Sequence, residues 1–315
     1  MKSPAPRPFI SPLTTRVAAI GVITLLLTAC AASNPPGAGA PDSEMPPQSR
    51  PAVFGHVHGL GVDSVTGVAY AATHGGLFEL PPAGATPIAA ADLGDPIAGR
   101  AQDTMGFTID GRQMFGSGHP DPAEQSAAPN LGFITSNDSA QTWQTLSLGG
   151  EADFHDIEVV RDAAGTLSVY AVDARTGQIT TSTDGGVTWH SGADVVMRDL
   201  TADPASGTVY ATTEQGLAVS DDDGATFEVD PDAPVMYLID WVDGPSADGL
   251  VGIDLDGTVW TRIGAEDWQE RGSVSGDAEA MAYSPVPQPV LLVADARGIV
   301  TSDDFGVTWQ AVVER

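Results

Sequence analysis

The stretch Ser182-Thr-Asp-Gly-Gly-Val-Thr-Trp189 decides the fold, because the chain contains three further copies of its pattern. The common frame is Ser-x-Asp-x-Gly-x-Thr followed by an aromatic residue, and only the first copy has alanine in place of the glycine. A pattern that recurs at a regular period is typical of repeat architectures. The other copies are Ser136-Asn-Asp-Ser-Ala-Gln-Thr-Trp143, Ser220-Asp-Asp-Asp-Gly-Ala-Thr-Phe227 and Ser302-Asp-Asp-Phe-Gly-Val-Thr-Trp309.

The spacing of the copies predicts six repeats. The interval from Ser220 to Ser302 is twice as long as the others and holds a degenerate copy at 261–268, which keeps the terminal Trp268. A second degenerate copy lies at 80–86. Six repeats over residues 51–315 give about 44 residues each, within the range of four-stranded propeller blades. We therefore expect an all-β fold with six four-stranded antiparallel blades, a six-bladed β-propeller; seven blades would require one repeat without a visible pattern.

The eight-residue pattern resembles the Asp-box (BNR) repeat of bacterial β-propellers. The resemblance implies a turn between the third and fourth strands, on the face opposite the usual ligand site. The aspartate of each box accepts backbone N–H groups, the glycine adopts positive φ, and the aromatic ring packs between blades. A calcium loop at Asp221-Asp-Asp223 is the alternative, but it lacks the ligand spacing of an EF-hand. The expected structural residues are Asp138, Asp184, Asp222, Asp304, Trp143, Trp189 and Trp309.

The N-terminal segment indicates export and lipid anchoring. Basic residues precede an apolar run, 17–27, that is too short to span a bilayer and is typical of an export signal. The run ends in Leu27-Thr-Ala-Cys30, which resembles the lipobox of bacterial lipoproteins, and Cys30 is the only cysteine of the chain. We expect a signal peptide at 1–29, a lipidated Cys30 followed by a disordered Pro/Gly/Ala-rich tether at 30–50, and the propeller at 51–315. The protein would then be anchored to the cell membrane on its extracytoplasmic face.

The net charge restricts the partners. A formal charge of −29 excludes nucleic acid, whose phosphates require Lys and Arg. It also disfavours anionic lipid surfaces except through an anchor. The membrane through Cys30, a small ligand or glycan, and a protein partner stay open.

The histidines are unevenly distributed. Five of the six lie in the first three repeats. Alignment of the first strands puts His58, Met105 and His155 at one equivalent position, and His74 and His119 are equivalent to each other at the ends of second strands. Since these strand ends meet on one face of a propeller, we expect these residues and the nearby His56 to gather at one mouth of the central channel.

Two functions compete for this cluster, and a purely structural role is the third possibility. Imidazole binds copper and zinc, and a thioether adds preference for Cu(I). In the first interpretation a transition metal, copper or zinc, binds His56, His58, His74, Met105, His119 and His155, while Asp103, Asp153 and Asp156 orient the imidazoles. In the second, the histidines line a pocket for an organic ligand.

Four segments are similar to those of exported bacterial Asp-box lipoproteins of a group labelled glycosyl hydrolase-like or sialidase-like. They are His56-Val-His-Gly-Leu60, Asp103-Thr-Met-Gly-Phe107, Gly116-Ser-Gly-His-Pro-Asp121 and Glu151-Ala-Asp-Phe-His155. The chain lacks the Arg-Ile-Pro motif of sialidases, so sialidase activity is disfavoured and enzymatic activity stays open. A glycosidase needs two facing carboxylates. The catalytic candidates are Asp103, Asp121, Glu151, Asp153, Tyr237 and Arg198; the other alternative is an extracytoplasmic protein-binding or assembly scaffold.

We predict that Cys30→Ala moves the protein from the membrane fraction to the soluble extracytoplasmic fraction. A strongly acidic protein is not attracted to an anionic membrane surface, so its attachment depends on the lipid chains. Metabolic labelling with a fatty acid, followed by fractionation, measures this. Ser33→Ala, three residues further along, is the matched control and leaves labelling unchanged. A Cys30→Ala protein that still incorporates label would contradict lipidation at this residue.

Overall fold

The computed structural model describes residues 55–124, 127–244 and 248–315. All of these residues belong to one compact unit, Ser49–Arg315. The expected signal peptide, Cys30 and tether lie outside the described residues and stay predictions. Within the described ranges, no helix is long and apolar enough to cross a membrane.

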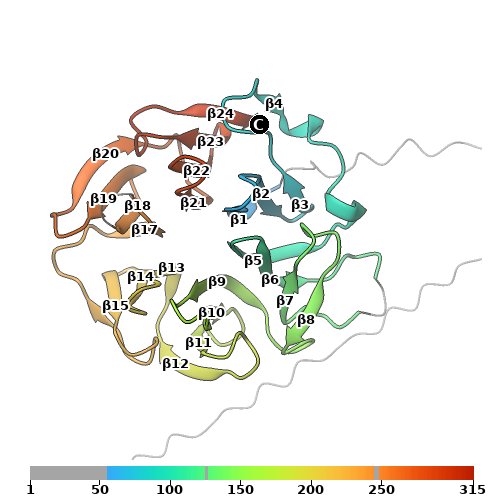
Figure 1. Ribbon diagram of the computed structural model, residues 1–315, viewed down its shortest axis with the longest axis horizontal. Helices are drawn as coiled ribbons and strands as arrows, with labels where there is room; N and C mark the ends of the chain where they lie inside the picture. Colours follow the sequence, from blue (N-terminus) through green and yellow to red (C-terminus); the bar gives the residue numbers. More distant parts are fainter. Residues whose placement is uncertain (1–54, 125–126, 245–247) are drawn as a thin grey trace, which may run out of the picture. The chain divides into compact units, whose positions relative to one another are not determined.

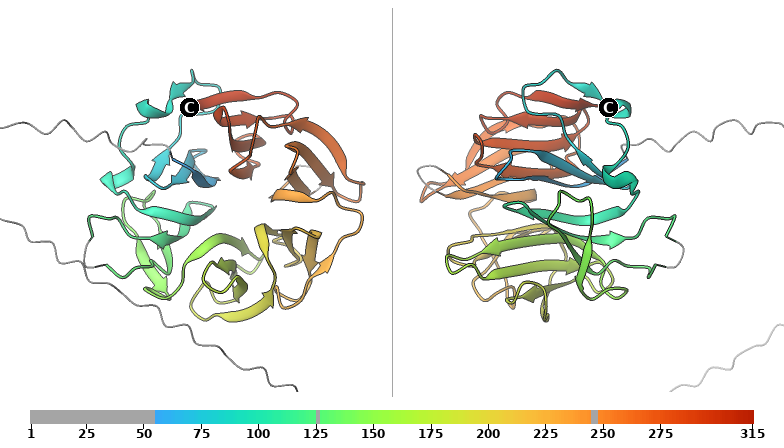
Figure 2. Two further views of the ribbon diagram at one scale, coloured as in Figure 1. Left: turned by 180° about the vertical axis from the view of Figure 1, so that it is seen from behind. Right: turned by 45° about the vertical axis from the view of Figure 1, so that its right-hand side comes forward.

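Six sheets, antiparallel except for one added strand, form a closed ring of blades, as Figure 1 shows along the central axis and Figure 2 shows from behind and obliquely. The six-bladed β-propeller expected from the repeats is confirmed. The strands are β1 (Val57–Val62), β2 (Ala69–Thr73), β3 (Gly76–Glu79), β4 (Ile88–Ala89), β5 (Asp103–Asp110), β6 (Gln113–His119), β7 (Phe133–Ser136), β8 (Gln144–Ser147), β9 (Phe154–Arg161), β10 (Leu167–Asp173), β11 (Gln178–Ser182), β12 (His190–Asp194), β13 (Met197–Ala202), β14 (Val209–Thr213), β15 (Gly216–Ser220), β16 (Glu228–Val229), β17 (Met236–Val242), β18 (Gly249–Asp254), β19 (Thr258–Ile263), β20 (Gln269–Ser273), β21 (Ala280–Ser284), β22 (Val290–Asp295), β23 (Gly298–Ser302) and β24 (Gln310–Glu314), with short 3₁₀ turns η1 (Ala90–Asp92) and η2 (Ile97–Gly99).

Blades 2 to 5 have four strands each, in chain order from the channel outwards. Blade 1 keeps three strands, β1 to β3, because the chain then crosses to blade 6. There β4 pairs in parallel with β24, so that blade 6 has five strands. Figure 1 shows β4 beside β24 at the labelled C-terminus. The first and last repeats are therefore joined by backbone pairing.

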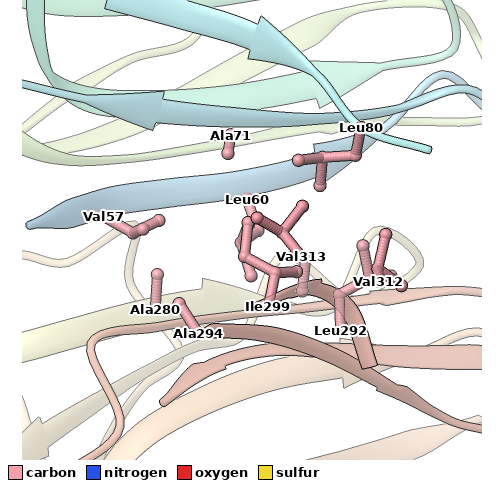
Figure 3. Close-up of a cluster of buried hydrophobic side chains, with 11 residues drawn as sticks. Val57, Leu60, Ala71, Leu80, Ala280, Leu292, Ala294, Ile299, Val312 and Val313 are labelled. Atoms are coloured by element: carbon pink, nitrogen blue, oxygen red, sulfur yellow. The ribbon is translucent and has the colours of Figure 1, made fainter. Parts of the chain in front are cut away.

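Each boundary between neighbouring blades is filled by its own apolar cluster. At the boundary of blades 6 and 1, Leu60 and Ala71 pack against Leu292 and Ile299 (Figure 3). All four side chains are buried. Full burial of one such leucine or isoleucine contributes about 1.5–3 kcal/mol. The alternating apolar residues of the inner strands thus hold adjacent blades face to face.

The first strand of each blade borders the channel and has no strand partner on that edge. In blades 1, 4, 5 and 6, carboxylates from the preceding blade accept free N–H groups of this strand. Asp240 Oδ2 accepts from the Tyr283 N–H with a donor–acceptor distance of 2.5 Å, and Asp199 Oδ2 accepts from Ile239 at 2.8 Å. Further acceptors of this kind are Asp156 for Leu200, Glu158 for Ala202, and Glu279 for Val57. Because buried N–H groups require acceptors, these acids belong to the fold.

The Asp box is a hydrogen-bonded turn centred on its serine. Ser182 is 1% exposed; its Oγ accepts from the Gly186 N–H at 2.9 Å and donates to Asp184 Oδ1 at 2.8 Å. Asp184 in turn accepts from both the N–H and the hydroxyl of Thr188. The boxes that begin at Ser136, Ser220 and Ser302 repeat the same bonds.

The box also binds the blade before it. The Gly186 carbonyl accepts from Ser147 Oγ of blade 2, and the Trp189 indole N–H donates to the same hydroxyl at 2.9 Å. Gly186 has φ of +84°, and a Cβ there would lie 2.2 Å from the ring of Phe133, so only glycine fits. The carbonyls of Gly224 and Gly306 accept from the outer strands of blades 3 and 5. The boxes are therefore both turns and links between blades.

We predict that Ser182→Ala destabilises the protein by about 1–3 kcal/mol, because it leaves the buried Gly186 N–H without its acceptor. Urea unfolding measures the change. Ser191→Ala, at an exposed position of β12, is the matched control and shifts stability by less than about 0.5 kcal/mol. Equal effects of the two substitutions would show that the box hydroxyl has no special role.

Candidate functional site

β-Bulges interrupt the first strands of five blades at equivalent positions. In β1, Val57 pairs with Thr73 and Gly59 with Ala72, so His58 is an extra residue without a cross-strand partner. Met105 in β5 and His155 in β9 are extra residues in the same way. The corresponding irregularities in blades 4 and 5 fall at Arg198–Asp199 and at Tyr237, whereas blade 6 pairs without interruption. A bulge turns its side chain out of the regular strand alternation and is common beside functional sites.

His58, His74 and Asp103 form the tightest polar group at this mouth. His58 Nε2 lies 3.1 Å from His74 Nδ1, His74 Nδ1 lies 3.0 Å from Asp103 Oδ1, and His58 Nε2 lies 3.6 Å from the same oxygen. His58 comes from the bulge of β1, His74 from the turn after β2, and Asp103 from the start of β5. Residues of two blades thus direct two nitrogens and one oxygen at a common point.

The environment of His58 keeps its imidazole neutral. The side chain is 8% exposed. Burial and the neighbouring His74 lower the pKa of His58 to about 4, although Asp103 acts in the opposite direction. At neutral pH the ring therefore carries a free lone pair, the form in which histidine binds metals.

A second group extends the first around the ring. His119 of β6 is the cross-strand partner of Asp103 in β5, and its Nδ1 lies 3.9 Å from Asp103 Oδ2. His119 Nε2 lies 3.6 Å from Asp153 Oδ2, and His155 Nε2 lies 3.4 Å from that same oxygen. The ring of the exposed His56 is centred 5.0 Å from that of His58. The five clustered histidines thus lie along one arc over blades 1 to 3, in two groups rather than one.

Two predicted members have other surroundings. Met105 is half-buried at its bulge in β5, two residues after Asp103, and its role as a ligand stays a prediction. Asp156, expected to orient an imidazole, instead accepts the backbone N–H of Leu200 and contributes to the channel wall. His190 lies on the outer strand β12, away from the arc.

The arc borders a central cavity of about 550 Å³. Its wall includes His58, His155 and the carboxylates that cap the first strands. Burial raises the pKa of Asp240 to about 7 and that of Asp199 to about 6. Burial and the neighbouring acids raise the pKa values of Asp156 and Glu158 as well. The channel is therefore acidic in composition but partly protonated near neutral pH.

The predicted catalytic residues are dispersed. Arg198 covers the ring of Tyr237 at 5.0 Å and donates to the Glu279 carbonyl at 2.7 Å. Asp121 accepts the N–H groups of Ala101 and Ala123 and holds its loop. Glu151 is exposed in the turn before β9. Of these six residues, only Asp103 and Asp153 lie within the histidine arc.

No protein-family model and no curated protein matches this sequence. Similar solved structures include a chain of the nidogen/laminin complex, with 13% identity and a TM-score of 0.56 over 78% of this chain and 92% of that one. The SapL1 lectin in complex with alpha methyl fucoside has 16% identity and a TM-score of 0.51 over 84% and 99%. A GH74 xyloglucanase from Xanthomonas campestris has 20% identity and a TM-score of 0.46 over 82% of this chain and 45% of its own. The first two similarities establish the propeller fold; the chain spans less than half of the xyloglucanase.

We predict that Asp240→Asn flattens the pH dependence of stability. Because the folded-state pKa of about 7 lies above the ordinary value of 3.8, the folded protein holds more protons than the unfolded chain between these pH values. This group therefore lowers stability as the pH rises from about 4 to about 7. Urea unfolding at several pH values measures the slope, with the exposed Asp267→Asn as control. An unchanged slope in Asp240→Asn would contradict the assignment.

Proposed function

We propose that this protein is an extracytoplasmic β-propeller that binds a transition-metal ion, copper or zinc, through His58, His74 and Asp103. The convergence of His58 Nε2, His74 Nδ1 and Asp103 Oδ1 supports this, since the three atoms lie within 4.8 Å of one another. His74 Nδ1 lies within hydrogen-bond distance of both His58 Nε2 and Asp103 Oδ1. A single hydrogen atom on one of these nitrogens cannot bridge all three atoms. A metal ion accepts all three lone pairs at once.

The separations match the requirements of coordination. Metal–ligand bonds of about 2.0–2.1 Å in a tetrahedral site place neighbouring ligand atoms about 3.3 Å apart. The three observed separations are 3.0, 3.1 and 3.6 Å. Small side-chain rotations therefore suffice to close the site around an ion, and exposure of His74 leaves room for a water or substrate ligand.

The donor atoms indicate the class of metal. Two imidazole nitrogens and one carboxylate oxygen suit Zn²⁺ and Cu²⁺ better than Ca²⁺ or Mg²⁺, which prefer oxygen alone. A nearby thioether, as Met105 would supply, shifts the preference towards Cu(I). The net charge of −29 adds a long-range attraction for cations.

An organic ligand such as a glycan is the second candidate. The central cavity of about 550 Å³ has the size of a small-molecule site, and its wall includes Arg198. The SapL1 lectin shares the propeller fold. However, Arg198 already covers Tyr237, and the channel acids Asp199 and Asp240 already accept backbone N–H groups. A glycan array tests this candidate independently.

We predict that His74→Ala and Asp103→Asn each weaken binding of Zn²⁺ or Cu²⁺ at least about 100-fold. Loss of a residue that only hydrogen-bonds a metal ligand already lowers metal affinity about 10–100-fold, and loss of the ligand itself lowers it at least as much. Isothermal titration calorimetry on protein without a histidine tag measures this. His190→Ala, at the only histidine outside the arc, is the control and retains full affinity. Absence of stoichiometric binding in the unsubstituted protein at micromolar metal would overturn the proposed function.

A further inference from the structure

The second group of the arc has the composition of another metal site. His119 Nε2 and His155 Nε2 both approach Asp153 Oδ2, at 3.6 and 3.4 Å. The first distance is too long for a hydrogen bond, and the second lies at the outer limit. Each distance is close to the separation of about 3.3 Å between neighbouring ligands of a tetrahedral ion. The nitrogens of His119 and His155 lie farther from each other than the ligand atoms of the first group, so both rings must turn towards Asp153 to close around an ion.

Asp153 is held in a position that requires a partner. The residue is 9% exposed, and its second carboxylate oxygen, Oδ1, is buried without a hydrogen-bond partner among the described residues. Its own backbone carbonyl accepts from Ala174, which fixes the turn before β9. A buried carboxylate without a donor or cation is costly, and a cation bound at Oδ2 compensates its charge. This orphaned oxygen is an observation independent of the histidine distances.

We propose that His119, Asp153 and His155 hold a second transition-metal ion, a refinement that rests on the proposed function of the first group. The imidazoles of His119 and His155 are 43% and 42% exposed, so they are free to turn towards the fixed carboxylate. Blades 2 and 3 supply this site, as blades 1 and 2 supply the first. The arc then carries two ions side by side on one face.

His119 and Asp103 lie between the two groups. Asp103 Oδ1 and Oδ2 lie 3.0 and 3.2 Å from His74 Nδ1, and Oδ2 lies 3.9 Å from His119 Nδ1. His119 presents its other nitrogen, Nε2, to the second group. The two proposed sites are therefore adjacent.

The test is the metal stoichiometry of the protein purified without a histidine tag and titrated with Cu²⁺ alone. We expect two equivalents in the unsubstituted protein, and one equivalent in each of His155→Ala and His74→Ala. Asp153→Asn also binds one, while His190→Ala keeps two. Electron paramagnetic resonance adds a separate readout, because two neighbouring Cu²⁺ ions broaden each other's signal and a single ion does not. Because His155 is exposed, His155→Ala tests the second site even when Asp153→Asn fails to fold.

One equivalent in the unsubstituted protein, lost in His74→Ala and kept in His155→Ala, would overturn the second site and leave the first standing. Two equivalents in both His155→Ala and Asp153→Asn would overturn the placement at blades 2 and 3. No equivalent at all would overturn the proposed function itself.

Discussion

The free inner edges of the six first strands are the constraint on which the structure depends. A propeller stacks its blades around a channel, and the strand nearest the axis has no neighbour on one side. Its N–H groups still require acceptors. Here side chains of the preceding blade provide them, as Asp240 does for Tyr283 and Glu279 does for Val57. The same bonds that satisfy each edge also set the rotation of one blade against the next.

This constraint separates structural acids from those free to bind a ligand. Four acids of the channel wall accept backbone N–H groups through their carboxylate oxygens: Asp156, Glu158, Asp199 and Asp240. Asp103 and Asp153 lie above them at the mouth, where imidazoles surround them. In a chain with 42 acidic residues, composition alone does not distinguish these two sets. Their position relative to the strand edges does.

The sequence predicted the fold and the gathering of the histidines at one end of the channel, but not their division into two groups. Spacing of the boxes gave six blades and the equivalence of His58, Met105 and His155, which the structure shows at corresponding bulges. The bulges themselves have no residue signature, because histidine, methionine and tyrosine all occupy them. Asp103 was expected behind the histidines and instead lies in the tightest group, since the turn after β2 brings His74 towards β5. The transfer of β4 to blade 6 also left no mark in the pattern, because it depends on contacts between distant repeats.

The manner in which the ring closes has a consequence for folding kinetics. Each blade is built from consecutive strands, so its internal contacts are local and form early. Closure instead pairs β4 with β24 and joins Val57 to Glu279, residues separated by 222 positions. Contacts of such high sequence separation form late, after the intervening blades exist. Until then the apolar faces of blades 1 and 6 are exposed, so the lifetime of the open ring, more than the stability of any blade, governs the risk of aggregation.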